Sequence, residues 1–206
     1  MNLRQIIIDT VKEIESVPYV KVGVSNRHIH LSQEDADILF GKGYKLTPIK
    51  GLLPGQFACA ETVTLSGKKG APLKARILGP ARSATQAELS VTDGFAMGLD
   101  VPVNESGDLS GAETVAIQNP ENGVTIERKC AIAALRHVHL TPEFAEKFGL
   151  KDKQMVSVEF EGQRGLVLGN VLLRVSRDFT DEMHIDLDEA NTGLIKNGDL
   201  GKIIPK

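Results

Sequence analysis

The 206-residue sequence has no tryptophan, two cysteines and only 4% aromatic residues, so its core must rely on aliphatic side chains. Cys59 and Cys130 stand apart and outside any C-x-x-C pattern, which predicts reduced, buried thiols in a cytoplasmic protein. No apolar run approaches the ~20 residues of a membrane span, and no signal peptide is visible. The net charge of −3 shows no basic excess, so neither a membrane nor a nucleic-acid partner is expected.

The chain is instead rich in short β-branched segments separated by glycine, proline, asparagine and aspartate. Such spacing is typical of small antiparallel barrels or sandwiches rather than of alternating strands and helices. The sequence therefore predicts a mainly β fold with short capping helices. The expected strands cover residues 19–25, 61–67, 73–79, 87–92, 113–118, 123–135, 155–162, 164–176 and 183–188.

Residues 1–19 form a separate element in this prediction, an amphipathic helix that ends at the Val17-Pro18 step. Two roles fit its pattern: packing on its own domain, or docking on another protein surface. Its apolar face is made of Leu3, Ile6, Ile7, Val11 and Ile14.

Four of the five histidines lie in two copies of one H-x-H motif. Residues 27–36 align without gaps with residues 136–145, and six of the ten positions are identical. Each copy is followed by a helix start, with Ser32 and Thr141 as predicted N-caps. We infer an internal duplication into two related halves, residues 20–124 and 125–206, with strand exchange between the halves allowed.

The H-x-H spacing places two imidazoles on one face of a strand, where they can chelate one metal ion. His28 and His30 form one pair, and His137 and His139 form the other. His184, the remaining histidine, is the natural third ligand for one pair. The other pair then needs a carboxylate.

Three glutamates are candidates for that carboxylate. Glu34 and Glu143 fall in the first turn of a predicted helix, where the helix dipole favours acidic residues without any metal. Glu88 follows Arg82 by six residues in a turn that leads into a strand, and an arginine there offers a fork for phosphate or carboxylate. We favour Glu88.

Four motifs, GVSNRHIHLS, GPARSATQAELS, RHVHL and MHIDLDEAN, together resemble the PduL-type phosphotransacylases, or phosphate propanoyltransferases. The resemblance runs from about Lys21 to Ile204. It implies two small β-barrel domains, one from each half, with a dinuclear zinc site between them, although another divalent transition metal can occupy such ligands. One zinc would be held by His28, His30 and Glu88, and the other by His137, His139 and His184. The resemblance also assigns phosphate binding and catalysis to Arg82.

The implied reaction interconverts a short acyl-CoA, propanoyl-CoA or acetyl-CoA, plus phosphate with acyl phosphate plus CoA, by direct attack of phosphate on the thioester. Members of the family act in bacterial microcompartments, in propanediol degradation among other pathways, so the N-terminal helix is also interpreted as a contact for shell or cargo. A homo-oligomer is expected. Alternatives are a zinc-dependent hydrolase of a thioester or phosphoester, and a non-enzymatic metal-binding module. Two roles fit a further set of polar residues equally, either orienting the imidazoles or lying in solvated turns: Asn26, Gln86, Asp186, Glu189 and Asn191.

Overall fold

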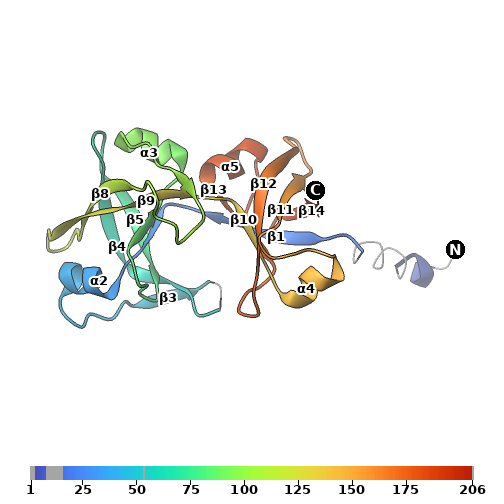
Figure 1. Cartoon of the computed structure of the whole chain (residues 1–206), viewed down its shortest axis with the longest axis horizontal. Helices are drawn as coiled ribbons and strands as arrows, with labels where there is room; N and C mark the ends of the chain where they lie inside the picture. Colours follow the sequence, from blue (N-terminus) through green and yellow to red (C-terminus); the bar gives the residue numbers. More distant parts are fainter. Residues whose placement is uncertain (1–2, 8–15, 53, 206) are drawn as a thin grey trace. The chain divides into compact units, whose positions relative to one another are not determined.

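The computed structural model describes residues 3–7, 16–52 and 54–205, which fold into two compact units (Figure 1). Unit 1 comprises Met1–Val24, Arg136–Ile185 and Glu189–Lys206. Unit 2 comprises Ser25–Leu135 and Asp186–Asp188. Both are built from β-strands with short helices, so the predicted fold class is confirmed.

Unit 2 contains a closed barrel in which β4, β5, β2, β6, β9 and β8 pair in that order and β8 returns to β4. The short strands β3 and β7 extend it at β4 and β9. The elements are β2 (His28–His30), α2 (Gln33–Phe40), β3 (Pro48–Gly51), β4 (Phe57–Ser66), β5 (Leu73–Gly79), β6 (Gln86–Glu88), α3 (Val91–Met97), β7 (Val103–Asn104), β8 (Glu113–Gln118) and β9 (Thr125–Ala134).

Unit 1 is a closed barrel with the strand order β1, β13, β10, β12, β11 and β14. Its strand with the second H-x-H motif, β10, runs parallel to β12 and antiparallel to β13. The elements are β1 (Tyr19–Ser25), β10 (His137–Leu140), α4 (Pro142–Lys147), β11 (Met155–Phe160), β12 (Leu166–Val175), β13 (Glu182–Asp186), α5 (Leu187–Gly193) and β14 (Leu200–Ile204).

The two barrels repeat one topology. In each, the H-x-H strand pairs in parallel with one neighbour, β5 or β12, and antiparallel with the other, β6 or β13. Strand β9 holds the place in unit 2 that β1 holds in unit 1. The predicted division at residue 124 falls between β8 and β9, whereas the compact units assign β1 to the later barrel and β9 to the earlier one.

Aliphatic side chains fill both cores, as the shortage of aromatic residues requires. In unit 2 the fully buried residues include Ile29 of β2 and Leu39 of α2. In unit 1 they include Val138 of β10 and Met183 of β13. In each H-x-H strand the residue between the histidines thus points into its barrel core, as the alternation of side chains along a strand demands.

The predicted helix starts are confirmed, but two further helices were missed. The Ser32 side chain accepts a hydrogen bond from the Asp35 amide, and Thr141 caps α4 in the same way with Pro142 at its first turn. The strand predicted over residues 87–92 ends at Glu88 and gives way to α3 at Val91, and the strand predicted over residues 183–188 was wrong only at its last two residues, where α5 begins. The Ser90 hydroxyl caps α3 and outweighs the strand propensity of Val91 and Thr92.

The predicted N-terminal helix is only partly covered by the structure. Residues 3–7 are helical and expose Leu3, Ile6 and Ile7, whereas residues 8–15 lie outside the described part. Among the described residues, no helix is long and apolar enough to span a bilayer.

Candidate active site

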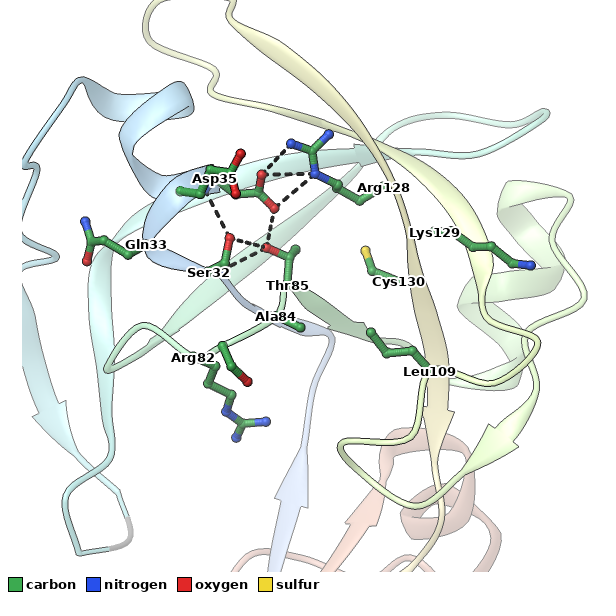
Figure 2. A pocket seen from close by; sticks show the side chains of 12 residues that line it. Ser32, Gln33, Asp35, Arg82, Ala84, Thr85, Leu109, Arg128, Lys129 and Cys130 are labelled. Carbon is green, nitrogen blue, oxygen red and sulfur yellow. Dashed lines mark hydrogen bonds and ion pairs between the residues drawn. The ribbon is translucent and has the colours of Figure 1, made fainter.

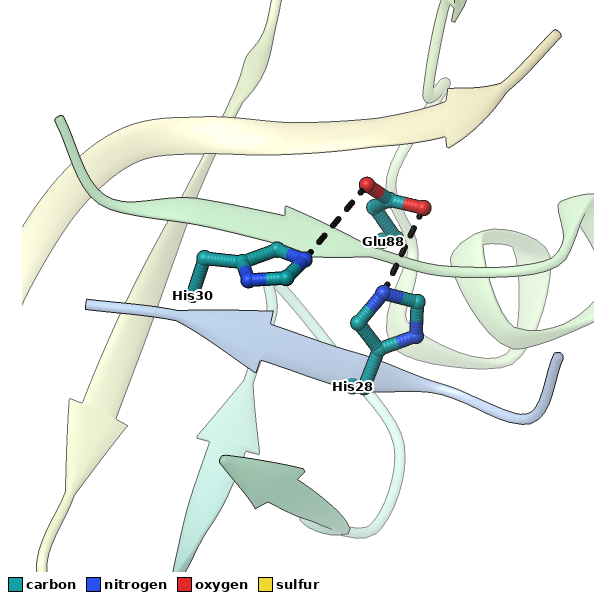
Figure 3. Close-up of side chains that lie close together, drawn as sticks. All are labelled: His28, His30 and Glu88. Atoms are coloured by element: carbon teal, nitrogen blue, oxygen red, sulfur yellow. Dashed lines mark ion pairs between the residues drawn. The ribbon is translucent and has the colours of Figure 1, made fainter. Parts of the chain in front are cut away.

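The first histidine pair and Glu88 come together in unit 2 through the antiparallel pairing of β2 with β6. His28 lies directly opposite Glu88 in this pairing. His28 Nε2 is 3.4 Å from Glu88 Oε2, and His30 Nε2 is 3.9 Å from Oε1 (Figure 3). One possible ligand atom from each residue lies within 4.8 Å of the others, so the three side chains can hold one metal ion.

Neighbouring groups fix the orientation of this triad. The Glu88 Oε1 atom accepts hydrogen bonds from Gln86 Nε2 at 2.6 Å and from the Ser106 hydroxyl at 2.8 Å. His28 Nδ1 lies 2.9 Å from the carbonyl oxygen of Asn26, which can only accept, so Nδ1 carries a proton and Nε2 faces the carboxylate. Such support is what metal-ligating side chains require.

The electrostatics of the triad favour a neutral imidazole beside a charged carboxylate. Burial, with the charges of His28 and Arg82 added, lowers the pKa of His30 to about 3. Burial acts to raise the pKa of Glu88, but the histidines, the Ser106 hydroxyl and Arg82 outweigh it and lower that pKa to about 2. Both groups are therefore held in the protonation state that binds a cation.

The second triad forms in unit 1 through the antiparallel pairing of β10 with β13. His137 lies opposite His184, and their ring centroids are 5.2 Å apart. The His139 ring is 4.8 Å from that of His137 and 5.0 Å from that of His184. Phe179, which the sequence analysis did not select, stacks on His139 at 4.1 Å.

The environment of His139 fits a metal ligand. Its side chain is buried, yet neither ring nitrogen has a hydrogen-bond partner in the described part of the chain. Burial, followed by the neighbouring His137 and His184, lowers its pKa to about 2, so the imidazole stays neutral. A buried polar atom without a partner is costly, and coordination of an ion through one nitrogen would remove part of that cost. Three imidazoles are a common ligand set for zinc.

The two triads occupy matching places in the repeated topology. Glu88 pairs with His28 in unit 2, and His184 pairs with His137 in unit 1, each opposite the first histidine of its motif. Strand pairing therefore favours Glu88 over Glu34. The latter lies in the first turn of α2, as Glu143 does in α4.

Arg82 lies in the segment between β5 and β6. Its backbone amide donates to the Leu31 carbonyl at 2.9 Å, next to the end of β2, and its charge acts on both His30 and Glu88. The residue also lines a pocket of about 650 Å³ with the start of α2 and part of β9 (Figure 2). The positively charged guanidinium group of Arg82 therefore lies near the first triad.

Among the predicted orienting partners, the structure supports some and gives others a different contact. Gln86 binds the Glu88 carboxylate, and Asn26 binds His28 through its backbone carbonyl. Glu189 forms an ion pair with Arg136 at 2.8 Å. Ser106 was missed, because it lies in a turn far along the chain and only folding brings its hydroxyl to the carboxylate.

Fold and site together define a duplicated double-barrel protein in which His28, His30 and Glu88 of unit 2 can hold one cation, and in which three histidines of unit 1 lie at the matching place. The chain belongs to the phosphate propanoyltransferase family, a family of acyltransferases, whose model matches residues 21–196. A phosphate propanoyltransferase of Thermotoga maritima is 50% identical over 91% of this chain and 90% of its own length. One of Clostridioides difficile is 43% identical over 99% of this chain and 98% of its own.

Proposed function

We propose that this protein interconverts a short-chain acyl-CoA plus phosphate with acyl phosphate plus CoA. Propanoyl is the acyl group that the names of its relatives indicate, and acetyl differs from it by one methylene group. Such a difference changes binding by only ~1–3 kcal/mol, so both substrates are expected to react. The observation that carries this proposal is the cation-binding triad of unit 2 with Arg82 beside it.

We propose that each triad binds one zinc ion, giving two per chain. His28, His30 and Glu88 would hold one ion, and the three histidines of unit 1 would hold the other. When bound, the ions supply positive charge that can stabilise a carbonyl oxygen and a leaving thiolate sulfur. The residues support this because each triad has one buried histidine, His30 or His139, whose lowered pKa keeps its imidazole neutral.

Arg82 has the role of binding and orienting phosphate. Its guanidinium carries parallel N–H donors that match the oxygens of a phosphate dianion. A phosphate oxygen held there forms a bond to the thioester carbonyl carbon while the carbon–sulfur bond breaks and CoA leaves as the thiolate. Fixing two reactants in one site lowers the entropic part of the barrier.

The cysteines support direct transfer rather than a covalent acyl-enzyme. Cys59 is fully buried and Cys130 is 2% exposed. Burial raises the pKa of each thiol to about 11, so neither supplies a thiolate near neutral pH. Phosphate itself is therefore the nucleophile in this proposal.

The test is to measure release of CoA from propanoyl-CoA with and without phosphate, and to trap acyl phosphate as its hydroxamate. Release that requires phosphate and yields equal amounts of both products supports the proposal. Release that proceeds without phosphate would indicate a hydrolase instead. Arg82→Ala is expected to raise the KM for phosphate, whereas the matched control Lys42→Ala, which removes an exposed charge from the same unit, should not.

We also propose that the N-terminal segment docks on another protein and that the chain forms a homo-oligomer. The exposed Leu3, Ile6 and Ile7 support a helix that docks on a microcompartment shell or cargo protein. Removing residues 1–15 should then leave acyl transfer intact but abolish co-purification with the compartment. A homo-oligomer would show as a mass above that of one chain in analytical ultracentrifugation.

A further inference from the structure

The segment that carries Arg82 is tied to the start of helix α2 at two points. The Arg82 amide donates to the Leu31 carbonyl at 2.9 Å, and the Ser32 amide donates to the Thr85 hydroxyl oxygen at 2.9 Å. These bonds hold both ends of residues 82–85 against the chain that leaves β2. The path of the backbone at Arg82 therefore depends on Thr85.

Thr85 in turn is held by an ion pair between the buried Asp35 and Arg128, whose side chain is 37% exposed. Its hydroxyl donates to Asp35 Oδ2 at 2.5 Å. Asp35 is 3% exposed, and its carboxylate accepts three contacts from Arg128 of β9, at 2.6, 3.0 and 3.2 Å. Figure 2 shows Ser32, Thr85, Asp35 and Arg128 joined in one network, with the Arg82 side chain extending away from it.

The other barrel shows which part of this arrangement the fold needs. In unit 1 the Ser176 amide donates to the Leu140 carbonyl at 3.1 Å, and the Thr141 amide donates to Asp181 Oδ1 at 2.7 Å. The two ties therefore recur. Ser176 stands in the place of Arg82, and Asp181 in the place of Thr85.

The ion pair does not recur. The sequence position equivalent to Asp35 is Phe144, which packs against the core of unit 1. Apolar packing stabilises a barrel at least as well as a partly buried ion pair, because desolvating the buried Asp35 carboxylate costs much of the Coulomb energy that the pair gains. Unit 2 has both Arg82 and the ion pair between Asp35 and Arg128, whereas unit 1 has Ser176 and Phe144 at the matching positions. This pattern indicates that the network serves Arg82 rather than the barrel.

We propose that Asp35, Thr85 and Arg128 are positioning residues that hold the Arg82 segment in the conformation in which Arg82 receives inorganic phosphate. The inference rests on the proposed role of Arg82. A guanidinium binds phosphate tightly only if its backbone is already placed, because otherwise part of the binding energy orders the segment. The network acts on the phosphate step and leaves the histidine triads untouched.

The experiment compares Thr85→Val with Thr85→Ser in the full-length, zinc-loaded enzyme. Valine keeps the shape of the side chain but neither accepts from Ser32 nor donates to Asp35, whereas serine can do both. We expect Thr85→Val to raise the KM for phosphate by ~10-fold or more, with KM for propanoyl-CoA and metal content within ~2-fold of wild type. Thr85→Ser should restore most of the affinity for phosphate.

Arg128→Lys provides a second variant that does not alter Thr85. Lysine keeps the positive charge but cannot donate from two nitrogens to the Asp35 carboxylate as Arg128 does, so the phosphate KM is expected to rise as it does in Thr85→Val. Tyr44→Phe is the matched control, since it removes a part-buried hydrogen bond to Glu61 elsewhere in unit 2 and should leave both KM values unchanged.

The results separate failure of this inference from failure of the proposed function. If Arg82→Ala raises the phosphate KM but Thr85→Val and Arg128→Lys do not, the positioning role is refuted and the role of Arg82 stands. If Arg82→Ala does not change the phosphate KM, the proposed role of Arg82 in binding phosphate is refuted, and the positioning role that rests on it is refuted as well. A uniform loss of kcat, metal and thermal stability in both positioning variants, with no selective change for phosphate, would reduce the network to a structural element and overturn the inference.

Discussion

Replacing Glu88 tests the assignment of the first triad most directly. Its Oε1 atom is occupied by Gln86 and Ser106, and its Oε2 atom faces His28 Nε2 at 3.4 Å. Glu88→Gln preserves the shape of the side chain but removes the negative charge. An ion between the two imidazoles would then lose its anionic ligand.

The size of the effect follows from the position of the carboxylate. Changes to groups that only orient a metal ligand typically cost 10–100-fold in affinity. Loss of the ligand charge itself should cost at least ~100-fold, or ~2.7 kcal/mol. The side chain is 12% exposed, so solvent cannot replace the missing charge cheaply.

The repeated topology offers a positive counterpart. Because Glu88 occupies the register position of His184, Glu88→His would give unit 2 the three-histidine set of unit 1. We expect this variant to bind zinc within ~10-fold of wild type, since imidazole is itself a good zinc ligand.

The measurement is metal content per chain by mass spectrometry, with affinities from competition against a chromophoric chelator. Wild type should retain two ions, Glu88→Gln about one and Glu88→His two. Far-UV circular dichroism checks that the variants fold. Two ions bound with unchanged affinity in Glu88→Gln would refute the ligand assignment, and equal defects in both variants would refute the equivalence of the two positions.

Three further outcomes follow from packing, thiol burial and metal linkage. Leu39→Ala deletes a fully buried side chain of α2 and should lower the free energy of unfolding by ~2–5 kcal/mol in urea titrations, while the exposed Ile38→Ala should change it by less than ~1 kcal/mol. Because burial raises the thiol pKa of Cys59 and Cys130 to about 11, both should stay protonated from pH 6 to 9; Ellman's reagent should modify neither in the native protein and both after guanidinium unfolding. Removing zinc with a chelator should lower the thermal midpoint of unfolding, and added zinc should restore it. If free zinc stands at a hundred times its dissociation constant, the free energy of unfolding should fall by ~2.7 kcal/mol on removal. An unchanged midpoint would contradict binding of zinc to the native state.

Local patterns predicted many of the elements. The expected strands at residues 19–25, 73–79 and 113–118 coincide with β1, β5 and β8, because apolar side chains recur there at every second residue, as they do in a strand with one buried face. The helices α3 and α5 were missed since each has seven residues and follows directly on a strand. In α3 a serine cap and the left-handed Gly98 define ends that strand-like residues conceal.

The sequence by itself determined the chemistry of this protein: which imidazoles come in pairs, that each pair shares a strand face, and that the unit is duplicated. These follow from covalent spacing and the two-residue period of a strand. The sequence also proposed Glu88 and His184 as the residues that complete the pairs, but only the tertiary structure brings them there, through the pairing of β2 with β6 and of β10 with β13. The tertiary structure also decided that β1, from the first half of the sequence, lies in the barrel of unit 1, and that β9, from the second half, lies in the barrel of unit 2. It brought Arg128 into contact with Asp35 as well, since contacts between distant residues are set by packing and not by local pattern.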